Sequence, residues 1–399
     1  MKILLVIPSL GNVYGGPTNI VIGWAEALAK HGVLVDIVTT NANGSEFLAV
    51  PLNKWLVEAG YRVQYFPCIN YKNYIWSNCF VKWATSNLKD YDIVHSSAIF
   101  SLFNLPAYRA CQFYNVPYIV APHGMLESWA LSHKAKRKKV YYELVEKQAL
   151  QHAAAIQATA SIESINLSKI KPRLKPPIIL IPNGVHIHEL ELKDKTLFYQ
   201  EFPHAANKLL ILFLGRIDPK KGLDLLAQAF AAVHAQFPLA HLIIAGPDNI
   251  NFLPTAQQYF AAAGCLEAVT FTGMLTGDLK QAALAAADVY VAPSYSEGFS
   301  MSVLEGMASG LPCVITTGCN FPEAASAQVA HVVDPIADQI GDALSRCLQD
   351  PEAAKAMGQR ARQFIFDHYT WDKIARDLIQ VYGAIIEKRP IPPCLLAPS

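Results

Sequence analysis

Four charged side chains of the C-terminal half stand where predicted strands give way to predicted helices. Arg216 and Lys221 follow an apolar run, while Glu297 and Glu305 lie within SEGFSMSVLEGM (296–307), which otherwise holds mostly small and apolar residues. Two cations beside a helix start suit a diphosphate, and carboxylates accept hydrogen bonds from paired hydroxyls. Taken singly, each could also be a solvated charge or an acid favoured by the helix dipole. Together they predict a ligand that combines phosphate with hydroxyl groups.

A helix predicted from about residue 299 or 300 to Gly310 sets the spacing of the two acids. Its first amides lack partners within the helix and carry about half a positive charge. Glu297 precedes those amides, and Glu305 lies roughly 8–9 Å further along the axis. An elongated ligand fits this order, with a sugar at Glu297, a diphosphate at the helix start and a ribose at Glu305.

The glycine-rich segment GNVYGGPTN (11–19) follows the first apolar run. It does not match the GxGxxG dinucleotide fingerprint, and no acid follows the second strand, where residues 39–41 are Thr, Thr and Asn. The P-loop pattern fails because Pro17 stands where its lysine should be. The segment is either a tight turn or a loop whose backbone approaches a ligand. A dehydrogenase is therefore disfavoured.

Strand-like and helix-like patterns alternate along the chain, which predicts parallel sheets covered on both faces. A polar segment, 185–207, interrupts the alternation and is predicted to be a linker. The sequence thus predicts an α/β fold with two doubly wound domains, 1–190 and 191–369, facing a central cleft. The predicted strands are 2–9, 33–40, 62–67, 91–97, 117–123, 154–160, 177–184, 208–215, 239–246, 268–273, 288–294, 312–317 and 330–335, and the clearest helices are 18–32, 222–238 and 370–389.

Composition excludes several classes of protein. The 399 residues are 52% hydrophobic and 16% charged, with a net charge of +1, which argues against disorder and against a nucleic-acid partner. The eight cysteines are scattered without a Cys/His cluster, so we expect reduced cytosolic thiols and no metal site. The opening MKILLVIPSLG is too short in apolar length for a leader, and no apolar stretch reaches the roughly 18 residues of a membrane span. We expect a buried first strand and a cytoplasmic protein.

With these motifs in place, the chain resembles the GT4 family of retaining glycosyltransferases, which have the GT-B fold. The resemblance implies a hexosyltransferase that uses a nucleotide-sugar donor without a metal or cofactor. It also implies that the C-terminal helix, about 370–399, crosses back to the N-terminal, acceptor-side domain. The matching segments are YGGP (14–17), PHGML (122–126), IPNGV (181–185), LGRIDPKKGLDLL (214–226), FTG (271–273) and PSYSEGFSMSVLEGMASGLPCVIT (293–316).

The resemblance assigns roles to individual residues. It implies that Arg216 and Lys221 contact the donor diphosphate, Glu297 the transferred sugar and Glu305 the ribose. Many relatives have glycine where Ser300 stands and an aliphatic residue at Ser302, although both serines still offer amides. The remaining donor-binding residues implied are Gly16 from the N-terminal domain, Met274 near the base, and Gly298, Phe299, Ser300 and Met301 at the phosphates.

His123 matches the family's histidine at the end of a strand in the N-terminal domain. A lone histidine is usually structural and twelve occur here, but this one precedes Gly124 at a strand's carboxyl end. The resemblance makes His123 and Glu297 the catalytic residues, with His123 positioning the sugar or the acceptor. Front-face attack, in which the leaving phosphate helps to deprotonate the acceptor, is the mechanism that the family implies.

The basic run HKAKRKK (133–139) is either a solvated helix face or a site for anionic lipid. Its surroundings resemble transferases of bacterial exopolysaccharide biosynthesis. We therefore expect a UDP-sugar donor, first of all UDP-glucose, and a saccharide or polyprenyl-diphosphate-linked acceptor, with peripheral contact to the inner face of the membrane through Lys134–Lys139. The alternatives are a sugar-nucleotide epimerase, which would need no acceptor, and a non-catalytic nucleotide-sugar sensor.

Overall fold

The computed structural model of the chain describes residues 1–71, 74–126, 141–170, 173–185 and 194–397. The chain forms two compact units, of which unit 1 is Met1–Gly184 with Trp371–Ser399 and unit 2 is Val185–Thr370. The predicted boundary at 190/191 lies a few residues beyond this division. The basic run 133–139, including the Lys134–Lys139 segment, lies outside the described residues.

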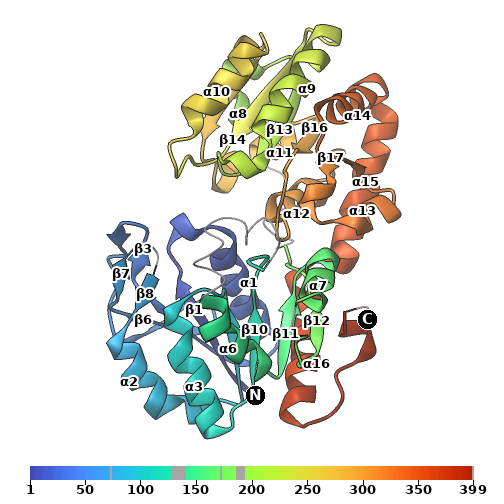
Figure 1. Cartoon of the computed structure of the whole chain (residues 1–399). Helices are drawn as coiled ribbons and strands as arrows, with labels where there is room; N and C mark the ends of the chain where they lie inside the picture. The colour runs from blue at the N-terminus through green and yellow to red at the C-terminus, as the bar shows by residue number, and fades with distance from the viewer. Residues whose placement is uncertain (72–73, 127–140, 171–172, 186–193, 398–399) are drawn as a thin grey trace. The chain divides into compact units, whose positions relative to one another are not determined.

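Unit 1 is built on an eight-stranded sheet in the order β12-β11-β10-β9-β1-β2-β6-β5 (Figure 1). Its strands pair in parallel, except that β5 runs antiparallel to β6 at the edge. Two short hairpins, β3–β4 and β7–β8, were not predicted. The strands are β1 (Lys2–Ser9), β2 (Leu34–Thr40), β3 (Ala42–Asn43), β4 (Glu46–Phe47), β5 (Trp55–Val57), β6 (Arg62–Phe66), β7 (Ile69–Tyr71), β8 (Tyr74–Trp76), β9 (Ile93–Ser97), β10 (Tyr118–Ala121), β11 (Ala155–Ala158) and β12 (Ile178–Leu180).

The first strand is buried, as predicted. It lies between β2 and β9, and its residues 3–6 are fully buried, which is why an uninterrupted apolar run forms it. Within the described residues, the α-helices of unit 1 are α1 (Gly16–Lys30), α2 (Asn78–Asn87), α3 (Leu105–Tyr114), α6 (Lys147–Gln151), α7 (Ser161–Ser168) and α16 (Trp371–Ile386), with a π-helical turn, η4, at Tyr142–Glu146.

The last long helix packs within unit 1. Helix α16 lies against α1, and its Trp371 ring lies so close to Gly23 that an added Cβ would meet the ring at 2.3 Å. Tyr382, on the same helix, reaches the fully buried His95 of β9, whose Nδ1 lies 2.7 Å from the tyrosine hydroxyl. Helix α16, which follows unit 2 in the sequence, therefore completes the core of unit 1.

Unit 2 is built on a six-stranded parallel sheet in the order β15-β14-β13-β16-β17-β18 (Figure 1). Alternate residues of β13 face two apolar clusters, since Leu210 and Leu212 pack on the side of α11 and α12 whereas Ile211 and Phe213 pack on the side of α9 and α14. Both sheet faces are thus covered, as predicted. The elements are β13 (Leu209–Leu214), β14 (Ala240–Ala245), β15 (Val269–Gly273), β16 (Val289–Ala292), β17 (Cys313–Thr316), β18 (His331–Val333), α8 (Thr196–Glu201), α9 (Leu223–Gln236), α10 (Leu253–Ala262), α11 (Gly277–Ala286), α12 (Met301–Ala308), α13 (Pro322–Ser326), α14 (Ala337–Gln349) and α15 (Pro351–His368).

The prediction of a linker over 185–207 was wrong for its second half. Residues 196–201 form α8, which packs against α11, and Phe198 is buried in the core of unit 2. The sequence pattern did not reveal this helix, because only one of its faces is apolar and the neighbouring residues are polar. Residues 186–193 are not described.

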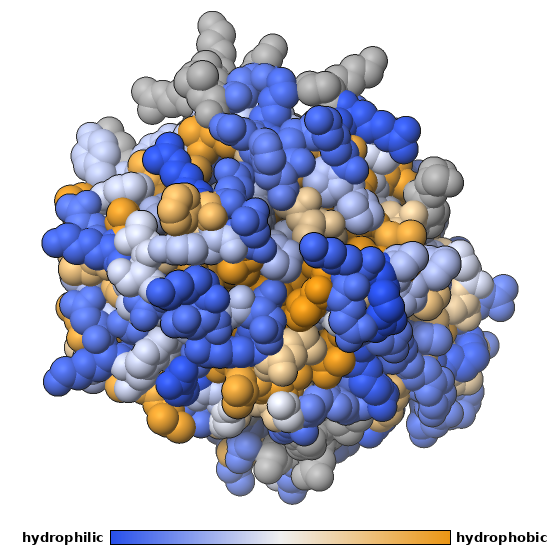
Figure 2. Space-filling model, turned by 90° about the horizontal axis from the view of Figure 1, so that it is seen from below, coloured by the Kyte–Doolittle hydropathy of each residue, from blue (hydrophilic) through white to orange (hydrophobic). Residues whose placement is uncertain are grey.

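The surface carries no broad apolar area in the view of Figure 2, where hydrophobic side chains are scattered among hydrophilic ones. Isolated exposed apolar residues are normal for a globular protein. Within the described residues, the helices are too short or too polar to cross a bilayer.

Candidate functional site

The loop after β13 brings Lys221 to Glu297. Gly222 ends that loop at a φ of 69°, and an added Cβ there would lie 2.1 Å from the carbonyl oxygen of Pro293, just after β16. The amide of Tyr295 donates to the carbonyl of Lys220 over 2.8 Å. Only glycine permits this close approach with a left-handed backbone, so the sequence at position 222 sets the distance between the two loops.

Lys221 and Glu297 form a buried ion pair, in which the Lys221 Nζ donates to the Glu297 Oε1. Lys220 adds a second ammonium, 3.9 Å from the other carboxylate oxygen. Burial by itself would raise the pKa of Glu297, but the charges of Lys221 and Lys220 outweigh it and lower that pKa. Burial lowers the pKa of Lys220, although Glu297 opposes the shift. The carboxylate is therefore ionised and compensated.

Further groups that were not predicted fix the Glu297 loop. The Ser294 hydroxyl donates to Glu297 Oε1 over 2.8 Å, and the Glu297 amide donates to the carbonyl of Gly318 over 2.8 Å. Asn320, in a left-handed conformation, donates from its side-chain amide to the backbone carbonyl of Glu297. Asn320 could have been noticed in the sequence as a short polar residue after β17. Its partner could not have been inferred, because Glu297 lies 23 residues away.

Helix α12 begins at Met301, close to the predicted start, with Ser300 as its N-cap residue and no side-chain cap. Its first amides therefore have no partner from a cap, which leaves donors and a positive dipole end available to an anion. Phe299 packs between the rings of Phe321 and Tyr369, with ring centroids 5.1 and 5.7 Å away. These apolar contacts anchor the first turn, as the composition of the stretch predicted.

Glu305 lies on α12 and pairs with Lys280 of α11 over 3.1 Å. Lys280 was not predicted, because the two residues come close only when α11 and α12 pack on the same sheet face. Arg216 follows β13 and lies 3.8 Å from Asp218. Met274 follows β15 and is 60% exposed, without a described contact to the other predicted residues. The structure thus joins Lys221 with Glu297 and gives Glu305 a separate partner.

In unit 1, the predicted glycine-rich loop leads directly into a helix. Gly16 is the first residue of α1, and Pro17 follows it, as is common at a helix start. Among the described residues, an added Cβ at Gly16 would meet nothing within 4 Å. No described packing within the unit therefore requires glycine there.

His123 lies in a tight turn after β10. The Met125 amide donates to the carbonyl of Pro122 over 3.2 Å, and both central residues, His123 and Gly124, have positive φ values of 53° and 74°. That backbone pattern is typical of a type I′ turn. The His123 Nε2 lies 3.2 Å from the Ser97 hydroxyl, while its Nδ1 is buried without a hydrogen-bond partner among the described residues. One ring nitrogen is thus held, whereas the other is buried and unpaired among the described residues.

An aromatic stack supports this ring from one side. Trp24 of α1 lies between His123 and His95, with ring centroids 5.7 and 4.6 Å away. Burial lowers the pKa of His123 to about 4 and that of His95 to about 3. Both imidazoles are therefore neutral at pH 7. Neither Trp24 nor His95 was predicted as part of the site.

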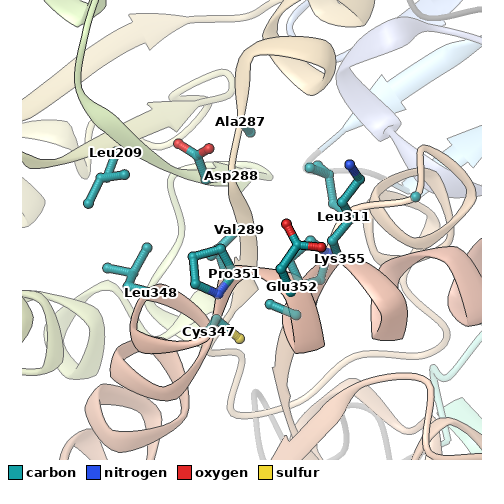
Figure 3. Close-up of a pocket in the computed structure, with 13 residues that line it drawn as sticks. Leu209, Ala287, Asp288, Val289, Leu311, Cys347, Leu348, Pro351, Glu352 and Lys355 are labelled. Atoms are coloured by element: carbon teal, nitrogen blue, oxygen red, sulfur yellow. The ribbon is translucent and has the colours of Figure 1, made fainter.

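A cavity of about 300 Å³ in unit 2 lies away from these groups (Figure 3). Its lining includes Leu209 and Val289, the first residues of β13 and β16, with Pro351 and Lys355 of α15 on another side. Because β13 and β16 run parallel, their amino ends lie at the opposite sheet edge from Lys221 and Glu297. The cavity is consequently not part of the candidate site.

Two sequence families match the chain, one in each half. Glycosyltransferase Family 4 matches residues 14–189, and Glycosyl transferases group 1 matches residues 187–364. A D-inositol 3-phosphate glycosyltransferase of Stackebrandtia nassauensis is 25% identical, over 97% of this chain and 90% of the relative. An uncharacterized glycosyltransferase of Methanocaldococcus jannaschii is 23% identical, over 92% and 93%.

Solved structures share the fold over nearly the whole length. The sucrose-phosphate synthase of Thermosynechococcus elongatus has a TM-score of 0.76 at 21% identity, covering 97% of this chain and 99% of that protein. Anabaena HepE in complex with UDP-glucose has a TM-score of 0.74 at 17% identity, covering 96% and 100%. At these identities the likeness shows the fold.

Proposed function

Since the chain belongs to the family 4 glycosyltransferases and has the GT-B fold, we propose that it moves a hexose from a UDP-sugar, first of all UDP-glucose, to a saccharide or lipid-linked saccharide. That it is a hexosyltransferase follows from the family; the donor and the acceptor are the proposal. The observation that carries it is the buried Lys221–Glu297 pair in the loops at the carboxyl edge of the unit 2 sheet, the edge from which α12 begins.

A donor would exchange the partners of this pair. In the structure, Lys221 neutralises Glu297; a bound diphosphate would take the ammonium, and the sugar hydroxyls would donate to the carboxylate. Arg216, the first amides of α12 (with Phe299, Ser300 and Met301) and Gly298 complete the proposed phosphate contacts, with Glu305 at the ribose and Met274 near the base. Such fixed positive groups stabilise a departing diphosphate without a metal.

His123 is proposed to position the transferred sugar or the acceptor. A general base works best when its pKa is near the working pH, and a pKa of about 4 makes this imidazole a weak base. Its Nδ1, which is buried and has no partner among the described residues, is proposed instead to hold a hydroxyl group once substrate is bound. We propose retention by front-face attack, with the leaving phosphate accepting the acceptor's proton and Gly16 approaching the donor from unit 1.

Solved structures of similar fold support the choice of donor, whereas the sequence relatives point to other acceptors. Structures of similar fold are described with UDP, with UDP-glucose and with UDP-2-fluoro glucose. Relatives named for D-inositol 3-phosphate and for phosphatidyl-myo-inositol transfer suggest that polyol phosphates belong in any acceptor screen. A role in exopolysaccharide biosynthesis remains our proposal, based on the resemblance over residues 122–138.

A screen of nucleotide sugars for hydrolysis by the pure protein tests the donor, and protection against thermal unfolding reports binding in parallel. We expect turnover of UDP-glucose, which Glu297→Ala and Lys221→Ala strongly reduce. Unchanged turnover in both variants would contradict the site. Product release without any acceptor, as an isomerised sugar, would favour the epimerase, whereas binding without turnover would favour the sensor.

Peripheral membrane contact through Lys134–Lys139 is proposed separately. Neutralising Lys136, Arg137, Lys138 and Lys139 together should remove the protein from floating liposomes that contain anionic lipid. Equal flotation of the variant and the parent protein would refute the contact.

A further inference from the structure

The turn that carries His123 places a non-glycine residue, His123 itself, in the left-handed region. A non-glycine residue with a φ of 53° is strained and keeps that conformation only where its surroundings hold it. The hydrogen bond from Met125 to Pro122 closes the turn but does not select this conformation of the two central residues. A further contact must therefore hold the backbone at His123 and Gly124.

Glu163 of α7 supplies that contact. Its Oε1 accepts the Gly124 amide over 2.6 Å, and its Oε2 accepts both the amide and the hydroxyl of Thr159, over 2.7 and 2.8 Å. Thr159 directly follows β11, which neighbours β10 in the sheet. One carboxylate thus joins the carboxyl ends of two adjacent strands, one of which leads to His123.

Burial of the Glu163 carboxylate carries a desolvation penalty. Glu163 is 1% exposed, and no cation contacts it within the part of the chain that the structure describes. Burial raises its pKa, while the three hydrogen bonds oppose that shift. A neutral residue at this position would avoid the desolvation of a charge. Since the carboxylate binds the amide adjacent to His123, its role concerns the turn and not only the packing of α7.

We propose that Glu163 is a positioning residue, which holds the His123 turn so that the imidazole presents Nδ1 in a fixed direction. The inference rests on the proposed function, because it assumes that His123 contacts sugar or acceptor. Ser97 and Trp24 restrain the ring, and Glu163 restrains the backbone beneath it. These three restraints come from β9, α1 and α7, and of the three only Glu163 acts on the backbone of the turn.

The variant Glu163→Gln removes the charge and one acceptor oxygen of the side chain while keeping its size. A glutamine keeps one acceptor oxygen but replaces the other by an NH₂ group, which would face an N–H donor of either Gly124 or Thr159. We expect kcat for donor turnover to fall on the order of 10- to 100-fold, because small misplacements of a reacting group have such effects. The donor KM should stay unchanged, since the proposed diphosphate contacts lie in unit 2.

Thr159→Val is the matched control. It removes one hydrogen bond to the same carboxylate but leaves the bond to Gly124 in place. It should lower the unfolding temperature as Glu163→Gln does, while kcat stays close to the parent value. If the two variants lose kcat by the same factor, the role of Glu163 is merely structural and the inference is wrong.

Long-range ¹H–¹⁵N spectra of the histidine rings give a readout that does not need activity. The His123 signals, identified with His123→Gln, should shift or broaden in Glu163→Gln and stay in place in Thr159→Val. Unchanged signals in Glu163→Gln would overturn the inference. If that variant does not fold, Glu163→Asp replaces it, because it keeps the charge but withdraws the carboxylate; parent-like signals together with parent-like kcat in Glu163→Asp would refute the inference equally.

The variant His123→Ala distinguishes a failure of the proposed function from a failure of this inference. If His123→Ala retains full donor turnover, His123 has no part in the reaction, whatever the spectra show about Glu163. If His123→Ala loses turnover but Glu163→Gln does not, the function stands and the positioning role falls.

Discussion

The two units hold their candidate side chains by opposite electrostatic means. In unit 2, Lys221 and Glu297 are both charged, both buried and neutralised by each other. In unit 1, His123 is neutral, stacked on Trp24 and backed by Glu163, which has hydrogen bonds but no described cation. The first arrangement can exchange one partner for a ligand, whereas the second arrangement keeps its geometry. We infer that unit 2 is built to bind charge and unit 1 to place a hydroxyl group.

The largest effect should follow when the charged pair is broken. Lys221→Ala leaves Glu297 buried without its main counter-charge, which should cost about 3–5 kcal/mol of unfolding free energy. It should also lower donor turnover by about 100- to 1,000-fold, since a donor to the developing anion is lost. Thermal unfolding and hydrolysis kinetics measure both effects.

The double variant Lys221→Met with Glu297→Leu sharpens this test. Replacing both charges by apolar groups should restore most of the stability, while turnover stays lost. Recovery of turnover in the double variant would show that the pair serves folding only.

Acid should destabilise unit 1 through its neutral histidines. Burial holds the pKa of His95 at about 3 against 6.5 in the unfolded chain, so the unfolded state binds more protons between these values. His95 thus contributes stability that is fully present above pH 6.5 and is lost as the pH falls, by about 2 kcal/mol at pH 5. The unfolding midpoint should drop less between pH 7.5 and 5 in His95→Asn than in the parent protein.

Glu146 acts in the opposite direction and needs its own variant. Burial raises its pKa to about 7, so its contribution is fully present below pH 4.5 and is lost as the pH rises through 7. Glu146→Gln should therefore steepen the loss of stability on acidification. An unchanged pH profile in both variants would show that these groups do not control it.

A smaller effect is expected at the ribose end of the proposed donor site. Glu305→Gln should raise the donor KM by about tenfold, the value of one charge-assisted hydrogen bond, with little change in stability because its pair with Lys280 is partly exposed. Lys280→Ala is the matched control, since it breaks the same ion pair but keeps the carboxylate. An equal rise of KM in both variants would assign the effect to the ion pair.

Removal of divalent metal should have no effect. If Lys221, Arg216 and the amides of α12 stabilise the leaving diphosphate, EDTA leaves donor turnover unchanged. If EDTA abolishes donor turnover and Mg²⁺ or Mn²⁺ restores it, a metal takes part in the reaction. The charged side chains of unit 2 would then not be sufficient to stabilise the leaving diphosphate.

Charged residues that follow buried strands are conspicuous in sequence, so part of the candidate site's geometry could be predicted. Lys221 and Glu297 were predicted in this way, and glycine at 222 explains why their loops meet. Lys280 could not be predicted as the partner of Glu305, since α11 and α12 come together only on the folded sheet. Helix α8 was missed because its apolar face is a single turn long and lies within a polar segment.

The sequence by itself determined the parallel cores of the two sheets, since apolar runs of strand length alternating with amphipathic helices have few other ways to bury their surfaces. It also determined which strand ends carry charge. The tertiary structure alone decided what those side chains meet. Glu163 reaches Gly124 across 39 residues, and Tyr382 reaches His95 across 287. Such contacts depend on how distant segments pack, and a local pattern of residues carries no record of that packing.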